Sequence, residues 1–232
     1  MIETRVPHSY ISLSDRPWIA VSYYTINTGY QNEVHFLIES LRKYGCDYYI
    51  EGIESRGSWL QNIRYRAEFL IRIMDMIEFS GRSFVWMDAD AVVVNPPTLF
   101  DDLHESDHDI AVHYRNGVEL LGGTIWFNRT EKTKRLMSIW RDAINAQRGI
   151  KEQVALQRIL HQRRGEFDVA SLPASYCKIF DLMRAVPESV VVHNQASRRF
   201  KNQVGIDRAE YQARFYAIAK EREIVKCCPS RS

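Results

Sequence analysis

The first 95 residues alternate between short apolar segments typical of buried strands and longer segments with helical periodicity. The apolar segments are WIAVSYY at 18–24, DYYI at 47–50 and FVWMDADAVVV at 84–94, and helices are predicted between them at 30–44 and about 64–79. Strands that alternate with helices in this order build a parallel sheet with helices on its faces. The sequence therefore predicts an α/β fold.

The second half of the chain has weaker periodicity but contains the same kinds of element, and no repeat or low-complexity linker divides it from the first half. We therefore predict that residues 1–232 form one domain. The elements predicted in the second half are short strands near 109–114, 118–127 and 189–193 and helices near 131–147, 151–164 and 207–224.

Basic and acidic side chains are nearly equal in number over the whole chain, but basic ones are concentrated near its end. The 31 basic and 29 acidic side chains give a formal charge of +2, which does not by itself indicate a polyanionic partner. Residues 192–232, however, carry nine basic and four acidic side chains, a net charge of +5. A solvated helix face is the commoner origin of such a segment. The alternative is a basic, non-catalytic module that binds nucleic acid.

Cysteine usage and apolar patterning favour a soluble, cytoplasmic protein. The four cysteines have neither zinc-ribbon spacing nor the density of a disulfide scaffold, so reduced thiols are predicted. The N-terminus has no apolar segment of the signal-peptide type, and no stretch approaches the roughly 18 to 20 apolar residues of a membrane span. We expect no membrane span, and the sequence predicts no particular oligomeric state.

Two carboxylates, Asp88 and Asp90, stand in a segment that otherwise has the composition of a buried strand. In open parallel sheets, ligands gather outside the carboxyl ends of the strands, and side chains two residues apart along a strand point the same way. Carboxylates that converge repel each other and lose hydration, so they need a positive partner. A divalent cation such as Mn²⁺ or Mg²⁺ fits that need. The alternative is that the chain turns at Met87 and that both carboxylates are solvated.

The segment WMDADAVVV, followed by NPP, resembles the DXD motif of GT-A glycosyltransferases, which hold a nucleotide-diphosphate sugar through a divalent metal. Four further segments resemble motifs of that family in the family's order: RAEFLIRIM at 66–74, ELLGGTIWFNRT at 119–130, KEQVALQRIL at 151–160 and VVVHNQASRRFK at 190–201. The resemblance covers roughly residues 18–201 and depends on the ordered combination, because each motif alone is weak.

The resemblance implies a GT-A-like, Rossmann-type α/β sandwich with a mostly parallel central sheet and helices on both faces. Residues from about 1 to 95 would be the nucleotide-binding half, about 96–206 the donor-sugar and acceptor half, and about 207–232 a basic C-terminal helix and tail. The implied activity is transfer of a sugar from a nucleotide-diphosphate donor, most often a UDP-sugar in this family, to a hydroxyl acceptor. The small-residue segment and the Glu-Gln pair resemble retaining enzymes, so retention of the anomeric configuration is expected.

The metal shell implied by the resemblance consists of Asp88, Asp90 and His193. Asp90 would be a direct ligand, and Asp88 would also approach the ribose. His193 follows three valines, so a core histidine bonded to the backbone is the alternative. A bound cation and cationic side chains would stabilise the negative charge that develops on the leaving diphosphate.

The start of two predicted helices supplies further implied site residues. Glu152 and Gln153 would provide one hydrogen bond to the sugar hydroxyls and one group close to the anomeric carbon, although Glu152 also suits a helix N-terminus because of the helix dipole. Arg66 would reach the diphosphate or the DXD carboxylates, whereas Arg64 would be a solvated helix residue. The catalytic group would then be Glu152, Gln153, Asp88 and Arg66.

Donor-binding residues are implied in three more segments. Gly122 and Gly123 permit close approach of a ligand to the backbone and Thr124 offers a hydroxyl, with a β-bulge as the competing explanation. The nucleobase contact of the family falls, by position only, on Tyr24 and Thr25. The diphosphate clamp would come from a segment that departs from the family's usual His, Gly and Lys-Pro-Trp motif, and its candidates are Arg198, Arg199 and Lys201.

The sequence HESDH at 104–108 matches the HEXXH signature of zinc proteases. That chemistry needs a stable helix that places His104 and His108 on one face, together with a third ligand. Acidic residues crowd the segment and a strand-like run follows at once, so a solvated loop is the preferred interpretation.

The sequence also bears on other functions that involve nucleotides or nucleic acid. No Gly-rich phosphate loop or GXGXXG pattern occurs, which disfavours nucleotidyltransferases, dinucleotide cofactors and ATP hydrolysis. A glycosyltransferase acting on a hydroxymethylated base in DNA would combine sugar transfer with the basic C-terminal segment, and steep salt dependence of DNA binding would favour it.

Overall fold

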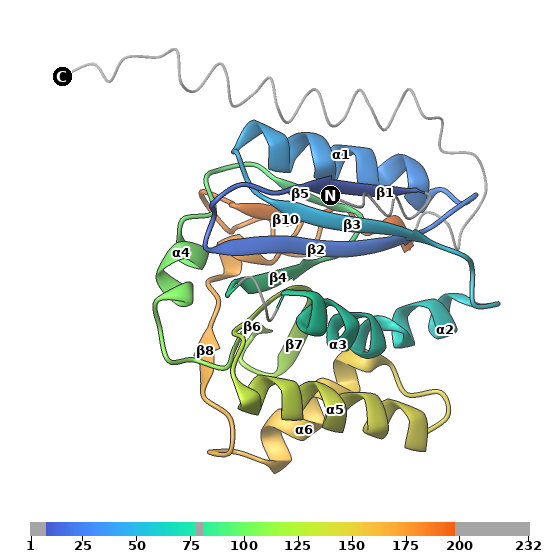
Figure 1. The fold of residues 1–232 in the computed structure, drawn as a ribbon, viewed down its shortest axis with the longest axis vertical. Coiled ribbons are helices and arrows are strands. Elements are labelled where there is room, and N and C mark those ends of the chain that lie inside the picture. Colours follow the sequence, from blue (N-terminus) through green and yellow to red (C-terminus); the bar gives the residue numbers. More distant parts are fainter. Residues whose placement is uncertain (1–7, 78–80, 198–232) are drawn as a thin grey trace. The chain divides into compact units, whose positions relative to one another are not determined.

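A seven-stranded sheet and a three-stranded sheet form the framework of the protein (Figure 1). The structure, a computed structural model, describes residues 8–77 and 81–197. The strand order is β1-β3-β2-β4-β7-β6-β8 in the large sheet and β5-β10-β9 in the small one. The strands are β1 Ser9–Ser12, β2 Trp18–Thr25, β3 Tyr48–Ile53, β4 Ser83–Met87, β5 Ala91–Val93, β6 Ile110–Arg115, β7 Glu119–Phe127, β8 Val169–Ser171, β9 Lys178–Ile179 and β10 Val191–His193. The helices are α1 Tyr30–Lys43, α2 Trp59–Arg64, α3 Arg66–Ile77, α4 Leu99–His104, α5 Glu131–Ala146 and α6 Glu152–Gln162, with a 3₁₀ turn, η2, at Ala174–Tyr176.

The large sheet is mixed, which corrects the expectation of a mostly parallel one. The strand-helix-strand order of the first half does give parallel pairing of β3, β2 and β4. In contrast, β1 is antiparallel to β3, and β7 is antiparallel to both β4 and β6. The connection between β6 and β7 explains part of the difference: a tight turn at Asn116 and Gly117, both with positive φ, reverses the chain and leaves no room for the crossover that parallel strands need.

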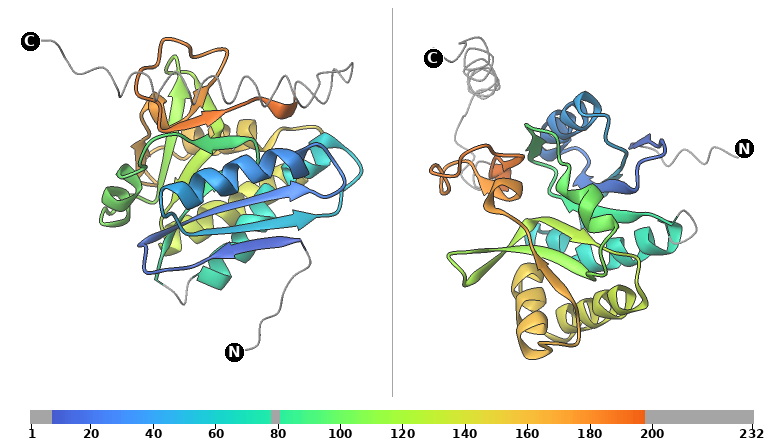
Figure 2. Two further views of the ribbon diagram at one scale, coloured as in Figure 1. Left: turned by 90° about the horizontal axis from the view of Figure 1, so that it is seen from above. Right: turned by 90° about the vertical axis from the view of Figure 1, so that its left-hand side faces the viewer.

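Helices cover both faces of the large sheet, which confirms the expected α/β class (Figures 1 and 2). Helix α1 lies on one face, whereas α3 and α5 lie on the other. Along β2, Ile19 and Val21 pack in the core on the α3 and α5 side, and Ala20 packs in the core on the α1 side. Because both faces are buried, the central strands have the continuous apolar composition seen in the sequence.

The predicted helix at about 64–79 is preceded by a separate short helix, α2. Ser58 caps α2, because its Oγ accepts a 3.2 Å hydrogen bond from the amide of Gln61. Tyr65 separates the two helices, so that α2 ends at Arg64 and α3 begins at Arg66. This break gives the two arginines different directions and different partners.

Two of the four cysteines lie in the part of the chain that the structure describes, and both are buried free thiols. Burial raises the pKa of Cys46 to about 11 and also raises the pKa of Cys177. The predicted helix at 207–224, most of the basic segment, and Cys227 and Cys228 lie outside the described residues. Within residues 8–77 and 81–197, no helix has both the length and the apolar composition needed to cross a membrane.

Candidate metal and donor site

The two carboxylates of the DXD segment lie on a turn between the two sheets. The apolar run at 84–94 is not one strand, because β4 ends at Met87 in the large sheet and β5 begins at Ala91 in the small one. The amide of Ala91 donates a 2.8 Å hydrogen bond to the carbonyl of Asp88, which closes the turn. Asp88 and Asp90 therefore come together through this turn and not through strand alternation, which corrects the geometric argument made from the sequence.

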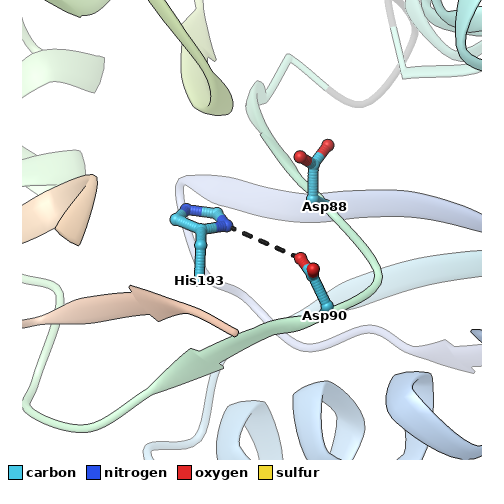
Figure 3. Close-up of side chains that lie close together, drawn as sticks. All are labelled: Asp88, Asp90 and His193. Atoms are coloured by element: carbon cyan, nitrogen blue, oxygen red, sulfur yellow. Dashed lines mark ion pairs between the residues drawn. The ribbon is translucent and has the colours of Figure 1, made fainter. Parts of the chain in front are cut away.

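The small sheet places His193 beside this turn. Strand β10 runs antiparallel to β5, with His193 opposite Ala91. One ligand atom from each of Asp88, Asp90 and His193 lies within 4.8 Å of the others, and His193 Nδ1 lies 3.9 Å from Asp90 Oδ1 (Figure 3). Among the described residues, no other cluster of three such side chains has this geometry. Two distant parts of the chain thus bring the three expected metal ligands together.

The surroundings of these side chains fit a divalent cation. Asp90 and His193 are buried, whereas the side chain of Asp88 is 37% exposed. The Nε2 atom of His193 lies 2.8 Å from Oγ1 of Thr124, so the imidazole is bonded to a side chain and not to the backbone. Its Nδ1 atom is buried and has no hydrogen-bond partner. A buried imidazole nitrogen facing two carboxylates is a ligand set that suits Mn²⁺, and the carboxylates also suit Mg²⁺.

Arg66, the first residue of α3, is a buried cation that connects three parts of the site. Its Nη2 donates a 2.7 Å hydrogen bond to Oδ1 of Asp88, and its Nη1 donates a 2.6 Å bond to the carbonyl of Gly122. The same Nη1 lies 3.3 Å from Oε1 of Glu152. The guanidinium carbon lies 4.5 Å from the centre of the Trp86 ring. The expected contact of Arg66 with the DXD carboxylates is therefore present at Asp88, and its contact with a diphosphate stays a prediction.

Trp86 is a site residue that sequence reasoning missed. Its Nε1 donates a 2.9 Å hydrogen bond to Oδ1 of Asp88, the same oxygen that Arg66 contacts. The signal was available in the sequence, because side chains two residues apart along β4 and its continuation share a direction. With both donors on Oδ1, the other oxygen of Asp88 is the one left for a ligand.

Glu152 and Gln153, at the start of α6, lie next to Arg66 and the glycine pair. Glu152 is buried, its Oε2 has no hydrogen-bond partner, and burial raises the pKa of its carboxyl while Arg66 opposes that shift. Its backbone carbonyl accepts a 2.7 Å hydrogen bond from Nε1 of Trp140. Oε1 of Gln153 accepts a 3.2 Å bond from the amide of Gly122. The structure thus brings both residues of the expected Glu-Gln pair to the segment that carries the glycines.

Side chains of the protein itself approach Gly122 and Gly123 closely. A methyl group added at Gly122 would lie 2.9 Å from Arg66 Nη1, and one added at Gly123 would lie 2.7 to 2.9 Å from three atoms of the His193 ring. A β-bulge is also present, because the register between β6 and β7 shifts where these glycines lie. The glycines therefore make room for an arginine and a histidine, and the competing β-bulge explanation holds as well.

The remaining expected donor contacts lie elsewhere or outside the described residues. The Tyr24 ring is buried in the core, and its hydroxyl donates a 3.0 Å hydrogen bond to the carbonyl of His8. Thr25 is buried too, with its Oγ1 2.9 Å from Oγ1 of Thr28. Their contact with a nucleobase stays a prediction. The diphosphate-clamp candidates lie outside the described residues: Arg198, Arg199 and Lys201.

Arg64 is not the solvated helix residue that the sequence suggested. Its guanidinium donates hydrogen bonds to the backbone carbonyls of Ile144, Gln147 and Ile150, at 2.9 Å for Gln147 and 3.2 Å for Ile150. These carbonyls lie at the end of α5 and in the connection to α6. Arg64 therefore holds the chain just before Glu152. Periodicity alone gives no signal for this contact, because the partners are backbone atoms distant in the sequence.

The two histidines of HESDH have separate partners. His104 ends α4, and its Nδ1 lies 3.1 Å from Oγ of Ser83. His108 lies beyond the helix, and its Nδ1 is 2.9 Å from a carboxylate oxygen of Asp168. The segment is partly helical, which differs from the expected loop, but the helix ends before the two imidazoles can share a face. The arrangement gives no support to a zinc protease.

A mixed α/β sheet with helices on both faces, and paired carboxylates beside a histidine at the junction of two sheets, define a GT-A-type glycosyltransferase architecture. The family model for the nucleotide-diphospho-sugar transferases matches residues 67–203, more than half of the chain. The chain belongs to this family and is a glycosyltransferase.

Solved structures with the same fold are also glycosyltransferases. A glycosyltransferase involved in the glycosylation of the major capsid of PBCV-1 matches with a TM-score of 0.62 and 16% identity, over 80% of this chain and 98% of that one. Apo GlyE of Streptococcus pneumoniae TIGR4 matches with a TM-score of 0.56 and 13% identity, over 83% of this chain and 58% of that one. The bifunctional WbbM apo structure matches with a TM-score of 0.53 and 13% identity, over 79% and 46%. No curated protein matches the sequence.

Proposed function

We propose that this glycosyltransferase moves a sugar from a nucleoside-diphosphate donor to a hydroxyl acceptor with the help of a divalent cation, Mn²⁺ or Mg²⁺, held by Asp88, Asp90 and His193. By frequency within GT-A enzymes the donor is a UDP-sugar. The observation that carries the proposal is the buried Nδ1 of His193, which has no hydrogen-bond partner and lies 3.9 Å from Oδ1 of Asp90. A cation bound there would neutralise charge that develops on the diphosphate as it leaves.

In this reaction the side chains of the protein would chiefly orient the donor and stabilise charge. Arg66 holds Asp88 through a 2.7 Å hydrogen bond and lies 3.3 Å from Glu152, so the two carboxylates share one buried positive partner. Gln153 and Glu152 stand at the start of α6, beside the glycine segment of β7. From this position they would contact the donor sugar and the anomeric carbon, as expected from the sequence.

We further propose that the reaction retains the anomeric configuration. The small-residue segment and the Glu-Gln pair resemble retaining enzymes, and Oε1 of Glu152 lies 3.3 Å from Nη1 of Arg66, an ion pair that engages this oxygen and does not leave it free to take the acceptor proton. In the proposed reaction, the bond from the anomeric carbon to the diphosphate oxygen breaks, the bond to the acceptor oxygen forms, and the acceptor proton passes to the diphosphate oxygen. The configuration of the product, followed by NMR, tests this part; an inverted product would overturn it.

Calorimetric titration of UDP and of UDP-glucose, first with Mn²⁺ and then with EDTA, tests the donor half of the proposal. We expect binding that needs the metal and that is lost in Asp90→Ala. His104→Ala is the matched control, because it removes an imidazole of the HESDH segment and should leave binding unchanged. Equal binding of several nucleoside diphosphates with and without metal would overturn the metal site.

A further inference from the structure

We infer that Thr124 and Gly123 together seat His193 in the tautomer that carries its proton on Nε2, which leaves the lone pair of Nδ1 directed toward Asp88 and Asp90. Thr124 and Gly123 are therefore positioning residues for His193. The part of this inference that concerns metal binding rests on the proposed function. The tautomer itself does not, because it follows from contacts within the chain.

The first contact is the hydrogen bond between His193 Nε2 and Thr124 Oγ1, which are 2.8 Å apart. Both side chains are buried, so neither atom exchanges this partner for bulk water. A neutral imidazole has one nitrogen that donates and one that accepts, and the hydrogen bond made by one nitrogen sets the role of the other. If Nε2–H donates to Thr124, the Nδ1 atom carries a lone pair.

The second contact is the close packing of Gly123 against the imidazole. A Cβ at position 123 would lie 2.7 Å from Cε1, 2.9 Å from Nδ1 and 2.9 Å from Nε2 of His193, distances that real Cβ atoms do not show. The ring therefore occupies the space that a side chain at this position would need. Gly123 thus allows the imidazole ring to pack against the backbone of β7, and the hydrogen bond to Thr124 orients the ring in that position.

The backbone around the pair holds this seat in place. The carbonyl of Gly123 accepts a 2.9 Å hydrogen bond from the amide of Asp88, and Thr124 is opposite Met87 in the β4–β7 pairing. The two residues that contact the histidine, Gly123 and Thr124, and the first carboxylate residue of the DXD turn are thus joined by the hydrogen bonds between β4 and β7. A shift of β7 would move His193 and Asp88 together, which keeps their relative placement constant.

The remaining nitrogen has the environment that the inference requires. Nδ1 of His193 is buried and has no hydrogen-bond partner, and the nearest acidic oxygen is 3.9 Å away on Asp90. A protonated Nδ1 would be expected to move to within hydrogen-bond distance of that carboxylate. A partner that orients a metal-binding imidazole in this way typically changes metal affinity by about 10- to 100-fold when it is removed.

Thr124→Val tests the inference, with Thr124→Ser and Thr133→Val as matched variants. Valine keeps the shape of threonine but cannot accept from Nε2–H, whereas serine keeps the hydroxyl. Thr133, in the first turn of α5, is also buried, and its hydroxyl donates a hydrogen bond to the carbonyl of Asp109. Thr133→Val therefore controls for the loss of a buried hydroxyl away from the site. Thermal unfolding of each variant shows whether it folds.

The first readout is the tautomer of His193 in metal-free protein, from ¹⁵N NMR of labelled histidine at alkaline pH, with His193→Ala to assign the signal. We expect Nε2–H in wild type, Thr124→Ser and Thr133→Val, and a shift of the proton to Nδ1 in Thr124→Val. The inference is overturned if wild type carries the proton on Nδ1, or if Thr124→Val keeps the wild-type tautomer.

The second readout is the affinity for Mn²⁺ in the presence of UDP. We expect Thr124→Val to bind Mn²⁺ about 10- to 100-fold more weakly, and Thr124→Ser and Thr133→Val to match wild type. Unchanged affinity in Thr124→Val, with tight binding by wild type, would overturn the role in metal binding while the proposed function stands. No Mn²⁺ binding by wild type would instead overturn the proposed function, and the tautomer measurement would then decide the inference by itself.

Discussion

Arg66 and Trp86 donate hydrogen bonds to the same oxygen of Asp88, at 2.7 Å and 2.9 Å. The two donors are themselves stacked, since the guanidinium carbon of Arg66 lies 4.5 Å from the centre of the Trp86 ring. This arrangement fixes one oxygen of the carboxylate, and the aromatic face of Trp86 attracts the guanidinium electrostatically. The first aspartate of the DXD turn is therefore oriented by the protein before any ligand binds.

Arg66→Ala is expected to lower the free energy of unfolding by about 3 kcal/mol or more, because it leaves Glu152 buried without its cation. Arg56→Ala is the control. Arg56 lies 3.7 Å from Glu68 of α3, and both side chains are exposed, at 46% and 61%, so its removal should cost less than about 1 kcal/mol. Urea unfolding of both variants measures the difference. Equal losses would show that the buried cluster contributes no more than a surface pair.

Trp86→Phe is expected to weaken metal-dependent UDP binding, because phenylalanine retains an aromatic ring for stacking but loses the donor to Asp88. The matched control is Trp126→Phe, since Trp126 is also buried and donates a 3.2 Å hydrogen bond to Oγ of Ser83. Both variants should lose about 1 to 3 kcal/mol of stability. Calorimetry with UDP and Mn²⁺ then separates them. Similar affinities in the two variants would argue against a role for the indole in orienting Asp88.

The two described cysteines are expected to resist modification in the folded protein. Burial raises the pKa of Cys46 to about 11, so at pH 8 only on the order of 0.1% of this thiol would be thiolate, and Cys177 is buried with a raised pKa as well. A Cys227→Ser, Cys228→Ser double variant removes the other two thiols. Reaction with a thiol-specific disulfide should be about 100-fold slower in buffer than in urea. Rapid reaction in buffer would contradict the burial of these side chains.

The sequence was sufficient where periodicity and local chemistry decide the structure. The order of apolar and helical segments predicted the elements from β2 to β4, and the DXD resemblance predicted that Asp88, Asp90 and His193 converge. It failed at the run 84–94, because an uninterrupted apolar segment does not reveal that its two ends belong to different sheets. The sequence-based prediction also contained too many parallel strand pairs, because which strands become neighbours, and in which direction they run, depends on tertiary contacts.

The roles of small and basic residues were also beyond sequence reasoning. The close packing of the His193 ring against Gly123 was not predicted, and the approach of a donor sugar to this glycine stays a prediction. Likewise, whether Arg64 is solvated depends on where the end of α5 lies, which no local pattern encodes. Contacts between a side chain and the distant backbone leave no periodic signal, so these residues could be interpreted only with the structure.

Arg64→Ala is expected to loosen the connection between α5 and α6 and thereby the placement of Glu152. Arg64 donates hydrogen bonds to three backbone carbonyls at the end of α5 and in the connection to α6, and a cation near the C-terminus of α5 also interacts favourably with the helix dipole. Loss of these bonds should lower the free energy of unfolding by about 1 to 3 kcal/mol, and Arg64→Lys should recover only part of it because lysine lacks the planar fork of donors.

Hydrogen exchange distinguishes local loosening from a global loss of stability. In Arg64→Ala we expect faster exchange of the Ile150 amide, which bonds the carbonyl of Gln147, and of the first turn of α6, with little change in β2 or β4. Arg148→Ala, an exposed arginine in the same connection, should behave like wild type. If the two variants exchange alike, Arg64 does not hold the chain before Glu152. If Arg64→Ala alone shows the local change, Arg64 and Arg66 have separate roles. Arg66 orients the carboxylates of Asp88 and Glu152, and Arg64 holds the segment that precedes α6.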